Sequence, residues 1–153
     1  MTSLENAIPP PLVALLCACL MWVAAQAGAA FDLLGPLREL IIAGLLALAT
    51  YCGLSAAFLF RDSATTLDPR KPSDVSVFVT DGVFRRSRNP MYLGMAFILT
   101  AWAFYLASLF AFAGVVLFVV YINRFQIVPE ERALQARFGD DFRDYCKRVR
   151  RWL

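Results

Sequence analysis

The sequence predicts an all-α integral membrane protein with four transmembrane helices, the last two forming a short hairpin, followed by a pair of amphipathic C-terminal helices. Two compositional facts support this class: 59% of the residues are hydrophobic and only 18% are charged, which is outside the usual range of soluble domains. Uncharged runs also recur at lengths suited to crossing a bilayer. With 153 residues the chain forms one domain, so any functional site must be built from the spans and their connections.

The first two spans are expected at residues 12–31 and 40–60. Each is an uncharged run close to the roughly 20 residues that a helix needs to cross the hydrocarbon core. The first run could be mistaken for a signal peptide, because residues 25–27 resemble a cleavage site. Residues 1–11, however, contain no Lys or Arg, which signal peptides carry before their apolar segment. We therefore expect the first run to remain as a span.

The third uncharged run, residues 89–123, is too long for one crossing. As a single helix rising about 1.5 Å per residue it would reach about 52 Å, well beyond the bilayer core. Two short spans at 91–106 and 109–124 fit better, with a turn between residues 106 and 110. No Pro marks this turn, so its position is predicted from the length of the run.

The basic residues predict the orientation. Arg38 is the only one before Arg61, and the rest lie in residues 61–88 or from Arg124 onward. Because Lys and Arg accumulate on the cytoplasmic side, we expect a cytoplasmic loop at 61–88, both termini in the cytoplasm, and residence in a bacterial inner membrane. An even number of spans must then separate the two basic groups, which supports the hairpin.

The chain after the hairpin predicts two further helices, at 129–138 and 140–152. Pro129 suits a first helical turn, and acids are favoured at this positive end of the helix dipole. Phe142, Tyr145 and Val149 recur at helical spacing, as in an amphipathic helix on the inner leaflet. Trp152 would anchor its end at the membrane interface.

Composition also argues against several partners. The chain has no His, which removes the commonest general base and metal ligand, and we expect no metal. Its cysteines, Cys17, Cys19, Cys52 and Cys146, show no Cys-x-x-Cys spacing and imply no disulfide framework. A net charge of +3 does not by itself indicate nucleic acid, and none is expected. The membrane and its lipids are the expected partners, and the oligomeric state stays open.

Two polar motifs mark a candidate site. The sequence Arg-Asn-Pro-Met-Tyr-Leu-Gly opens the third span at 88–94, and the adjacent acids Glu130 and Glu131 follow the hairpin. The hairpin brings Asn89, Tyr92 and Glu130 to one membrane face, and these three are the catalytic candidates. Taken singly, each motif is as consistent with helix capping and with Arg88 reaching lipid headgroups as with function. Their conjunction favours a site.

At these residues the sequence resembles the isoprenylcysteine carboxyl methyltransferase family and its phospholipid N-methyltransferase relatives, which are integral membrane enzymes that use S-adenosylmethionine. The resemblance covers the chain from about Val75 to the C-terminus. It rests on four ordered segments: residues 79–84, residues 88–94, Glu130-Glu131, and Phe138-Gly139 followed by Tyr145 and Val149.

The resemblance implies which residues contact the methyl donor. They are Ser76, Val77, Phe78, Val79, Phe84, Arg88, Asn89, Pro90, Met91, Tyr92 and Glu130, with Gly94 and Glu131 completing the family pattern. Gly94 would let either a ligand or another helix approach closely. The family usually has His at Asn89, so hydrogen bonding is expected there in place of proton transfer.

The substrate candidates are Arg124 and Gln126. In the prenylcysteine enzymes an Arg that grips the substrate carboxylate falls at Gln126, and Gln lacks that charged two-pronged grip. The methyl acceptor therefore stays open among an isoprenylcysteine-like carboxylate, a phospholipid amine and another small lipid. A carboxylate acceptor needs no base, whereas an amine or thiol must lose a proton to Glu130, Glu131 or Tyr92.

Two other functions remain as alternatives. One is an NADPH-dependent membrane reductase of the sterol-reductase type, although this chain is much shorter than those enzymes. The other is a non-enzymatic membrane scaffold subunit whose basic tail binds anionic lipid. Binding of S-adenosylmethionine, S-adenosylhomocysteine or NADPH would separate these possibilities.

Overall fold

The structure, a computed structural model, describes residues 5–28, 35–62 and 80–153. All regular structure in these ranges is helical, which confirms the all-α prediction for the described part of the chain. The elements are α1 (Pro10–Gln26), α2 (Pro36–Asp62), η2 (Gly82–Arg85), α3 (Pro90–Tyr105), η3 (Leu109–Ala111), α4 (Phe112–Ile122), the π-helical turn η4 (Asn123–Ile127) and α5 (Val128–Arg148).

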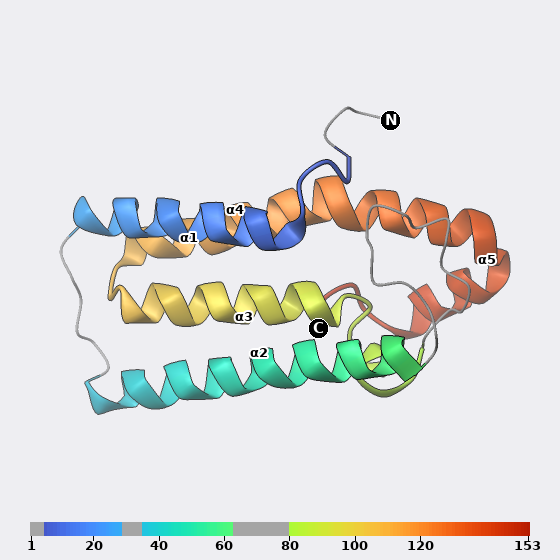
Figure 1. The fold of residues 1–153 in the computed structure, drawn as a ribbon, viewed down its shortest axis with the longest axis horizontal. Helices are drawn as coiled ribbons and strands as arrows, with labels where there is room; N and C mark the ends of the chain where they lie inside the picture. Colours follow the sequence, from blue (N-terminus) through green and yellow to red (C-terminus); the bar gives the residue numbers. More distant parts are fainter. Residues whose placement is uncertain (1–4, 29–34, 63–79) are drawn as a thin grey trace.

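Helix α3 is the centre of the bundle. It lies between α2 on one side and the pair α1 and α4 on the other (Figure 1). Two glycines permit close approach: a Cβ atom on Gly94 would lie 3.1 Å from the backbone oxygen of Ala49 in α2, and one on Gly114 would lie 2.2 Å from Cγ of Met21 in α1. Small residues at such contacts are typical of membrane helix packing.

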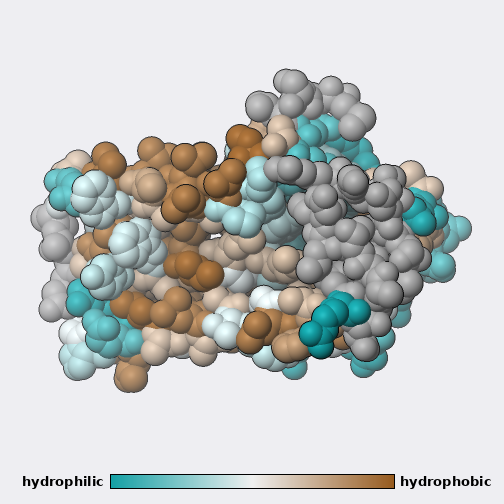
Figure 2. All heavy atoms as spheres, viewed as in Figure 1, coloured by the Kyte–Doolittle hydropathy of each residue, from teal (hydrophilic) through white to brown (hydrophobic). Residues whose placement is uncertain are grey.

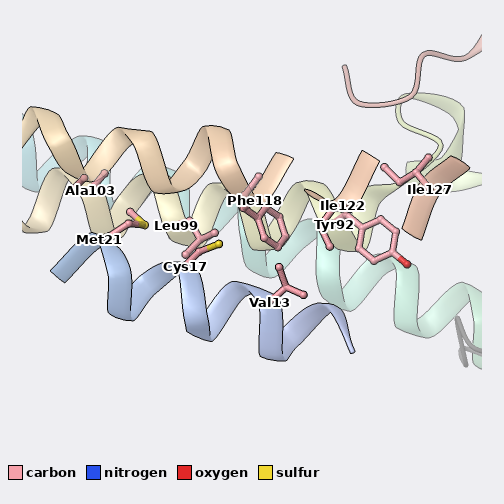
Figure 3. Close-up of a cluster of buried hydrophobic side chains, with 11 residues drawn as sticks. Val13, Cys17, Met21, Tyr92, Leu99, Ala103, Phe118, Ile122 and Ile127 are labelled. Carbon is pink, nitrogen blue, oxygen red and sulfur yellow. The ribbon is translucent and has the colours of Figure 1, made fainter. Parts of the chain in front are cut away.

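The main hydrophobic core joins α1, α3 and α4. Figure 3 shows side chains from α1, α3 and α4 meeting there, with Tyr92 at one end of the cluster. A second cluster packs α2, α3 and η2 together, and it contains Cys52, Ala56, Val83, Phe84 and Leu93. The core thus runs along α3 and ends where α3 begins.

The outer faces are apolar. Leu15 on α1, Leu40 and Leu54 on α2, and Val116 on α4 are all more than half exposed, and Figure 2 shows one face that is largely hydrophobic between its more polar ends. Two helical stretches, Pro36–Leu59 and Leu109–Arg148, are long and apolar enough to cross a membrane, while α1 and α3 are shorter apolar helices. The four-span topology itself remains a prediction.

The reversal between α3 and α4 lies within the predicted turn. Helix α3 ends at Tyr105, Ala107 adopts a positive φ of 48°, and Ser108 is extended before η3 begins. The first two helices differ in their ends from the predicted spans. Helix α1 is Pro10–Gln26 where residues 12–31 were predicted, and α2 is Pro36–Asp62 where residues 40–60 were predicted.

The C-terminus differs from the prediction. Helix α5 bends at Gly139, whose φ of 52° and ψ of −120° are non-helical, so the bend falls between the two predicted helices; the second half ends at Arg148 and not at residue 152. Val149 is extended. Trp152 packs against both hydrophobic clusters, and its predicted role as an interface anchor remains a prediction. We call residues 149–152 the C-terminal strap.

The N-terminal segment lies at the same end of the bundle as the strap. The Asn6 amide donates to the Phe125 carbonyl at 3.0 Å, and the Arg88 amide donates to the Arg150 carbonyl, also at 3.0 Å. Both contacts involve the region where α3 begins and α4 passes into α5 (Figure 1). The two described chain ends therefore share one end of the bundle, and its assignment to the cytoplasm remains a prediction.

Candidate functional site

The π-helical turn carries the two acids to this end of the bundle. Helix α4 continues through η4 directly into α5, and Glu130 and Glu131 lie in the first turn of α5, beyond the predicted span 109–124. A π-helical segment adds a residue to a turn and frequently occurs at functional sites. The continuous path from α4 through η4 into α5 thus places both acids next to the start of α3.

Glu130 has a hydrogen-bond donor but no cation. The Tyr92 hydroxyl donates to its Oε1 at 2.5 Å, and in the described part of the chain no Lys or Arg forms an ion pair with it. Burial raises the pKa of Glu130 to about 7; the Tyr92 hydrogen bond lowers it and the charge of Glu131 raises it further. This carboxyl group therefore titrates near neutral pH, where a general base is most effective.

Glu131 is held by two arginines. Nη2 of Arg88 donates to its Oε1 at 2.7 Å, while Nη2 and Nε of Arg151 donate to Oε2 and Oε1 at 2.5 and 3.1 Å. Burial alone would raise the pKa of Glu131, but the hydrogen bonds from Arg151 and Arg88 outweigh it and lower this pKa below its usual value. Glu131 stays ionised and serves as an anchor.

Arg88 and Asn89 contact the C-terminal strap. Nη1 of Arg88 donates to the carbonyls of Cys146 and Val149 at 3.1 and 2.6 Å. Asn89 stands at the N-cap position of α3 but makes no capping hydrogen bond; its Nδ2 donates to the Arg151 carbonyl at 2.9 Å. The capping role considered for Asn89, and headgroup contact for the partly buried Arg88, are therefore replaced by contacts within the protein.

The other donor-site candidates lie around the second hydrophobic cluster. Pro90 and Phe84 are buried, Met91 packs against this cluster, and α2 occupies the space beside Gly94. The Phe84 carbonyl accepts a hydrogen bond of 2.6 Å from the Tyr145 hydroxyl, which ties η2 to α5. Four further candidates lie outside the described residues: Ser76, Val77, Phe78 and Val79.

The two substrate candidates contact the N-terminal segment. Gln126 is 1% exposed, and its Nε2 donates to the Ile8 carbonyl at 2.8 Å. Arg124 lies 3.8 Å from a carboxylate oxygen of Glu5, and Arg132 pairs with the same oxygen at 2.8 Å. The structure therefore brings Arg88, Tyr92, Glu130 and Glu131 together. Gln126 and Arg124 instead contact residues of the N-terminal segment.

Sequence reasoning missed the strap's contribution to this constellation. Arg151 was counted only among the basic residues of the tail, yet it is the two-pronged partner of Glu131. The indole Nε1 of Trp152 donates to Oδ1 of Asn123 in η4 at 3.1 Å. The one available signal was that Glu131, as a carboxylate near an apolar boundary, needs compensating cations.

Helices with apolar outer faces and a carboxylate pair gathered at one polar end are typical of a membrane protein, and they mark a candidate site at the bundle's edge. The family model for phospholipid methyltransferase matches residues 38–141, well over half of the chain. The chain therefore belongs to the phospholipid methyltransferase family, which confirms the predicted relationship. The matched region includes residues 88–94 and both acids, and it ends before the strap.

One relative matches a shorter region. An uncharacterized protein of Haemophilus influenzae (strain Rd) is 48% identical over 63 residues, which are 41% of this chain and 100% of that protein. No solved structure matches the chain. Methyl transfer is accordingly the activity that the family indicates.

Proposed function

We propose that this protein transfers a methyl group from S-adenosylmethionine to the amine of a phospholipid at the membrane surface. Membership in the phospholipid methyltransferase family indicates methyl transfer to lipid. The observation that carries the finer proposal is Glu130: a largely buried carboxyl group held by the Tyr92 hydroxyl, with no cationic partner in the described part of the chain.

The site's residues fit a cationic donor. S-adenosylmethionine carries a positive sulfonium and a positive amino group, and ionised Glu130 supplies a negative charge that no cation among the described residues neutralises. The aromatic ring of Tyr92 beside it adds a face that favours cations. When bound, the donor supplies an activated methyl group; the protein's part is to align the reactants and exclude water. Residues 76–79 and Phe84 remain part of the proposed donor site on the strength of the resemblance.

An amine is favoured over a carboxylate as acceptor. Gln126, at the position of the carboxylate-gripping Arg in the prenylcysteine relatives, donates its amide to Ile8 and offers no charge. An ammonium group must lose its proton before its nitrogen can form the new N–C bond while the donor's S–C bond breaks. Glu130, whose pKa is about 7, can accept that proton, and the donor leaves as S-adenosylhomocysteine.

The test begins with binding. Full-length protein in detergent is titrated with S-adenosylmethionine, S-adenosylhomocysteine and NADPH by calorimetry. We expect both adenosyl compounds to bind and NADPH not to bind. Folded protein that binds neither adenosyl compound would refute the proposal, and NADPH binding in their place would favour the reductase.

Methyl transfer to lipid then tests the acceptor. Radiolabelled donor is supplied with vesicles of phosphatidylcholine containing phosphatidylethanolamine, and with matched vesicles that contain a prenylcysteine analogue. Label should enter phosphatidylethanolamine. Label found only in the prenylcysteine analogue would refute the amine acceptor and retain the donor.

A further inference from the structure

The C-terminal strap is held by the three residues that precede α3. The carbonyls of Val149, Arg150 and Arg151 accept hydrogen bonds in turn from Arg88 Nη1 at 2.6 Å, the Arg88 amide at 3.0 Å and Asn89 Nδ2 at 2.9 Å. The Ser87 hydroxyl, on a side chain 1% exposed, donates at 3.5 Å to the Arg151 carbonyl. A chain segment whose successive carbonyls are all hydrogen-bonded is docked structure and not a loose tail.

The strap's side chains reach two other elements. Arg151 grips Glu131 at the start of α5 with two nitrogens, and Trp152 donates to Asn123 in η4. The strap therefore joins the start of α3, which carries Tyr92, to η4 and to α5, which carries Glu130. Side chains from three separate segments meet at the strap beside the proposed site.

We infer that Arg151 is a positioning residue for the Glu130 site, acting through Glu131. The inference rests on the proposed function. Arg151 neutralises the acid directly adjacent to Glu130 and fixes the first turn of α5, so that Glu130 keeps its place opposite Tyr92. Without Arg151, Glu131 would retain Arg88 but would lose one of its two cations and the hydrogen bond to its Oε2, so its negative charge next to Glu130 would be less fully offset.

Among the described residues, few charges act on Glu130. Tyr92 faces Glu130 from α3, and Glu131 is its neighbour on α5. Arg88 and Arg151 bind Glu131, and they influence Glu130 by offsetting the charge of Glu131. Loss of Arg151 should therefore make Glu130 harder to ionise, because a nearby like charge disfavours the charged form. The protein would then need a higher pH to present an ionised Glu130 to the donor.

Arg150 provides a matched control within the strap. Its side chain is exposed, and among the described residues its one hydrogen bond goes to the Leu153 carbonyl at 3.5 Å. Arg150→Gln removes the same charge and the same type of side chain as Arg151→Gln. Only Arg151→Gln removes the contact with Glu131.

The experiment measures S-adenosylhomocysteine affinity by calorimetry from pH 5.5 to 8.5, on the full chain in detergent. For Arg151→Gln we expect about tenfold weaker binding near pH 7. We also expect the pH at which affinity falls to half on the acidic side, the acidic midpoint, to lie about half a pH unit higher than in the wild type. Arg151→Lys should bring the acidic midpoint close to the wild-type value, because it keeps the charge. It should not restore the affinity, because Lys lacks the two-pronged guanidinium that holds Glu131. Arg150→Gln should match the wild type.

The outcomes separate the two proposals. Wild-type protein that binds no donor analogue at any pH would overturn the proposed function and this inference with it. Wild-type binding with an unchanged Arg151→Gln profile, or with weaker binding and an unmoved midpoint, would overturn the inference alone. If Arg151→Gln does not fold, Arg151→Lys decides: reduced affinity supports the positioning role, and wild-type affinity refutes it.

Discussion

Glu130 and Glu131 are neighbours in sequence, yet they sit in opposite environments. Glu131 is bound by Arg88 and Arg151, whereas Glu130 meets only the Tyr92 hydroxyl among the described residues. Consecutive helical side chains point about 100° apart, so one acid faces the strap and the other faces the end of the bundle. The comparison separates an acid that holds the structure from an acid left available for a cationic ligand.

The largest expected effect follows from Glu130→Gln. The amide oxygen can still accept the Tyr92 hydrogen bond, but the negative charge and the proton acceptor are lost. We expect at least about a hundredfold loss of methyl transfer, measured with radiolabelled donor in lipid vesicles, with helicity by circular dichroism unchanged. Glu131→Asp, which keeps a charge at the anchor, is the control; activity within a fewfold of wild type for Glu130→Gln would remove Glu130 from the chemistry.

Glu131→Gln should act on stability. It leaves two partly buried arginines without their carboxylate, and breaking such a pair is costly. Because the Arg151 side chain is 38% exposed, solvent screening reduces the cost, and we expect about 2 kcal/mol lower free energy of unfolding in detergent by chemical denaturation. A loss no larger than that of Arg150→Gln would mean that the two ion pairs contribute little.

The two acids also predict opposite pH dependences. The pKa of Glu130 is raised to about 7 in the fold, so its contribution to stability is fully present below its unfolded value and is lost as pH rises through 7. The pKa of Glu131 is lowered, so its contribution is present above its usual pKa and is lost only as pH falls well into the acid range.

Between pH 5 and 8 only Glu130 of this pair titrates. We expect the wild type to lose about 1 to 3 kcal/mol of stability across this range, measured by thermal unfolding, and Glu130→Gln to show a flatter profile. A wild-type profile as flat as that of the variant would contradict the raised pKa.

The smallest effect is expected for Tyr92→Phe. The change removes one hydroxyl from Glu130 and preserves the ring that packs on the main core. Since the hydrogen bond lowers the pKa of Glu130, its loss should raise this pKa further and reduce methyl transfer about tenfold at neutral pH. The acidic limb of the pH–rate profile is the measurement, and an unshifted limb would show that the hydroxyl does not tune Glu130.

Much of the fold followed from local patterns. The length of the run 89–123 predicted a reversal that the structure places around Ala107, and Gly139 marks the bend between the predicted C-terminal helices. The pairing of Tyr92 with Glu130 followed from hairpin topology, which brings the start of α3 and the start of α5 together. These features depend on spacing along one or two helices, which sequence records directly.

The errors all concern contacts between distant segments. The amphipathic spacing of Phe142, Tyr145 and Val149 continues past Arg148, but the helix stops there because carbonyls 149–151 find donors at Arg88 and Asn89. For Trp152, the residue type predicted a membrane-interface anchor but not the contacts that the structure adds, which are packing against both hydrophobic clusters and an N–H donated to Asn123. Such choices depend on which partner lies nearby in space.

By itself the sequence determined that the chain is helical and apolar outside, and that one end gathers its polar residues, because hydrophobic periodicity and run length are local properties. Only the tertiary structure decided which acid is neutralised and which is not. That outcome depends on where the C-terminal strap docks: Arg151 lies 20 residues beyond Glu131 in the chain, and burial and partner geometry, not residue type, set the state of each carboxyl group.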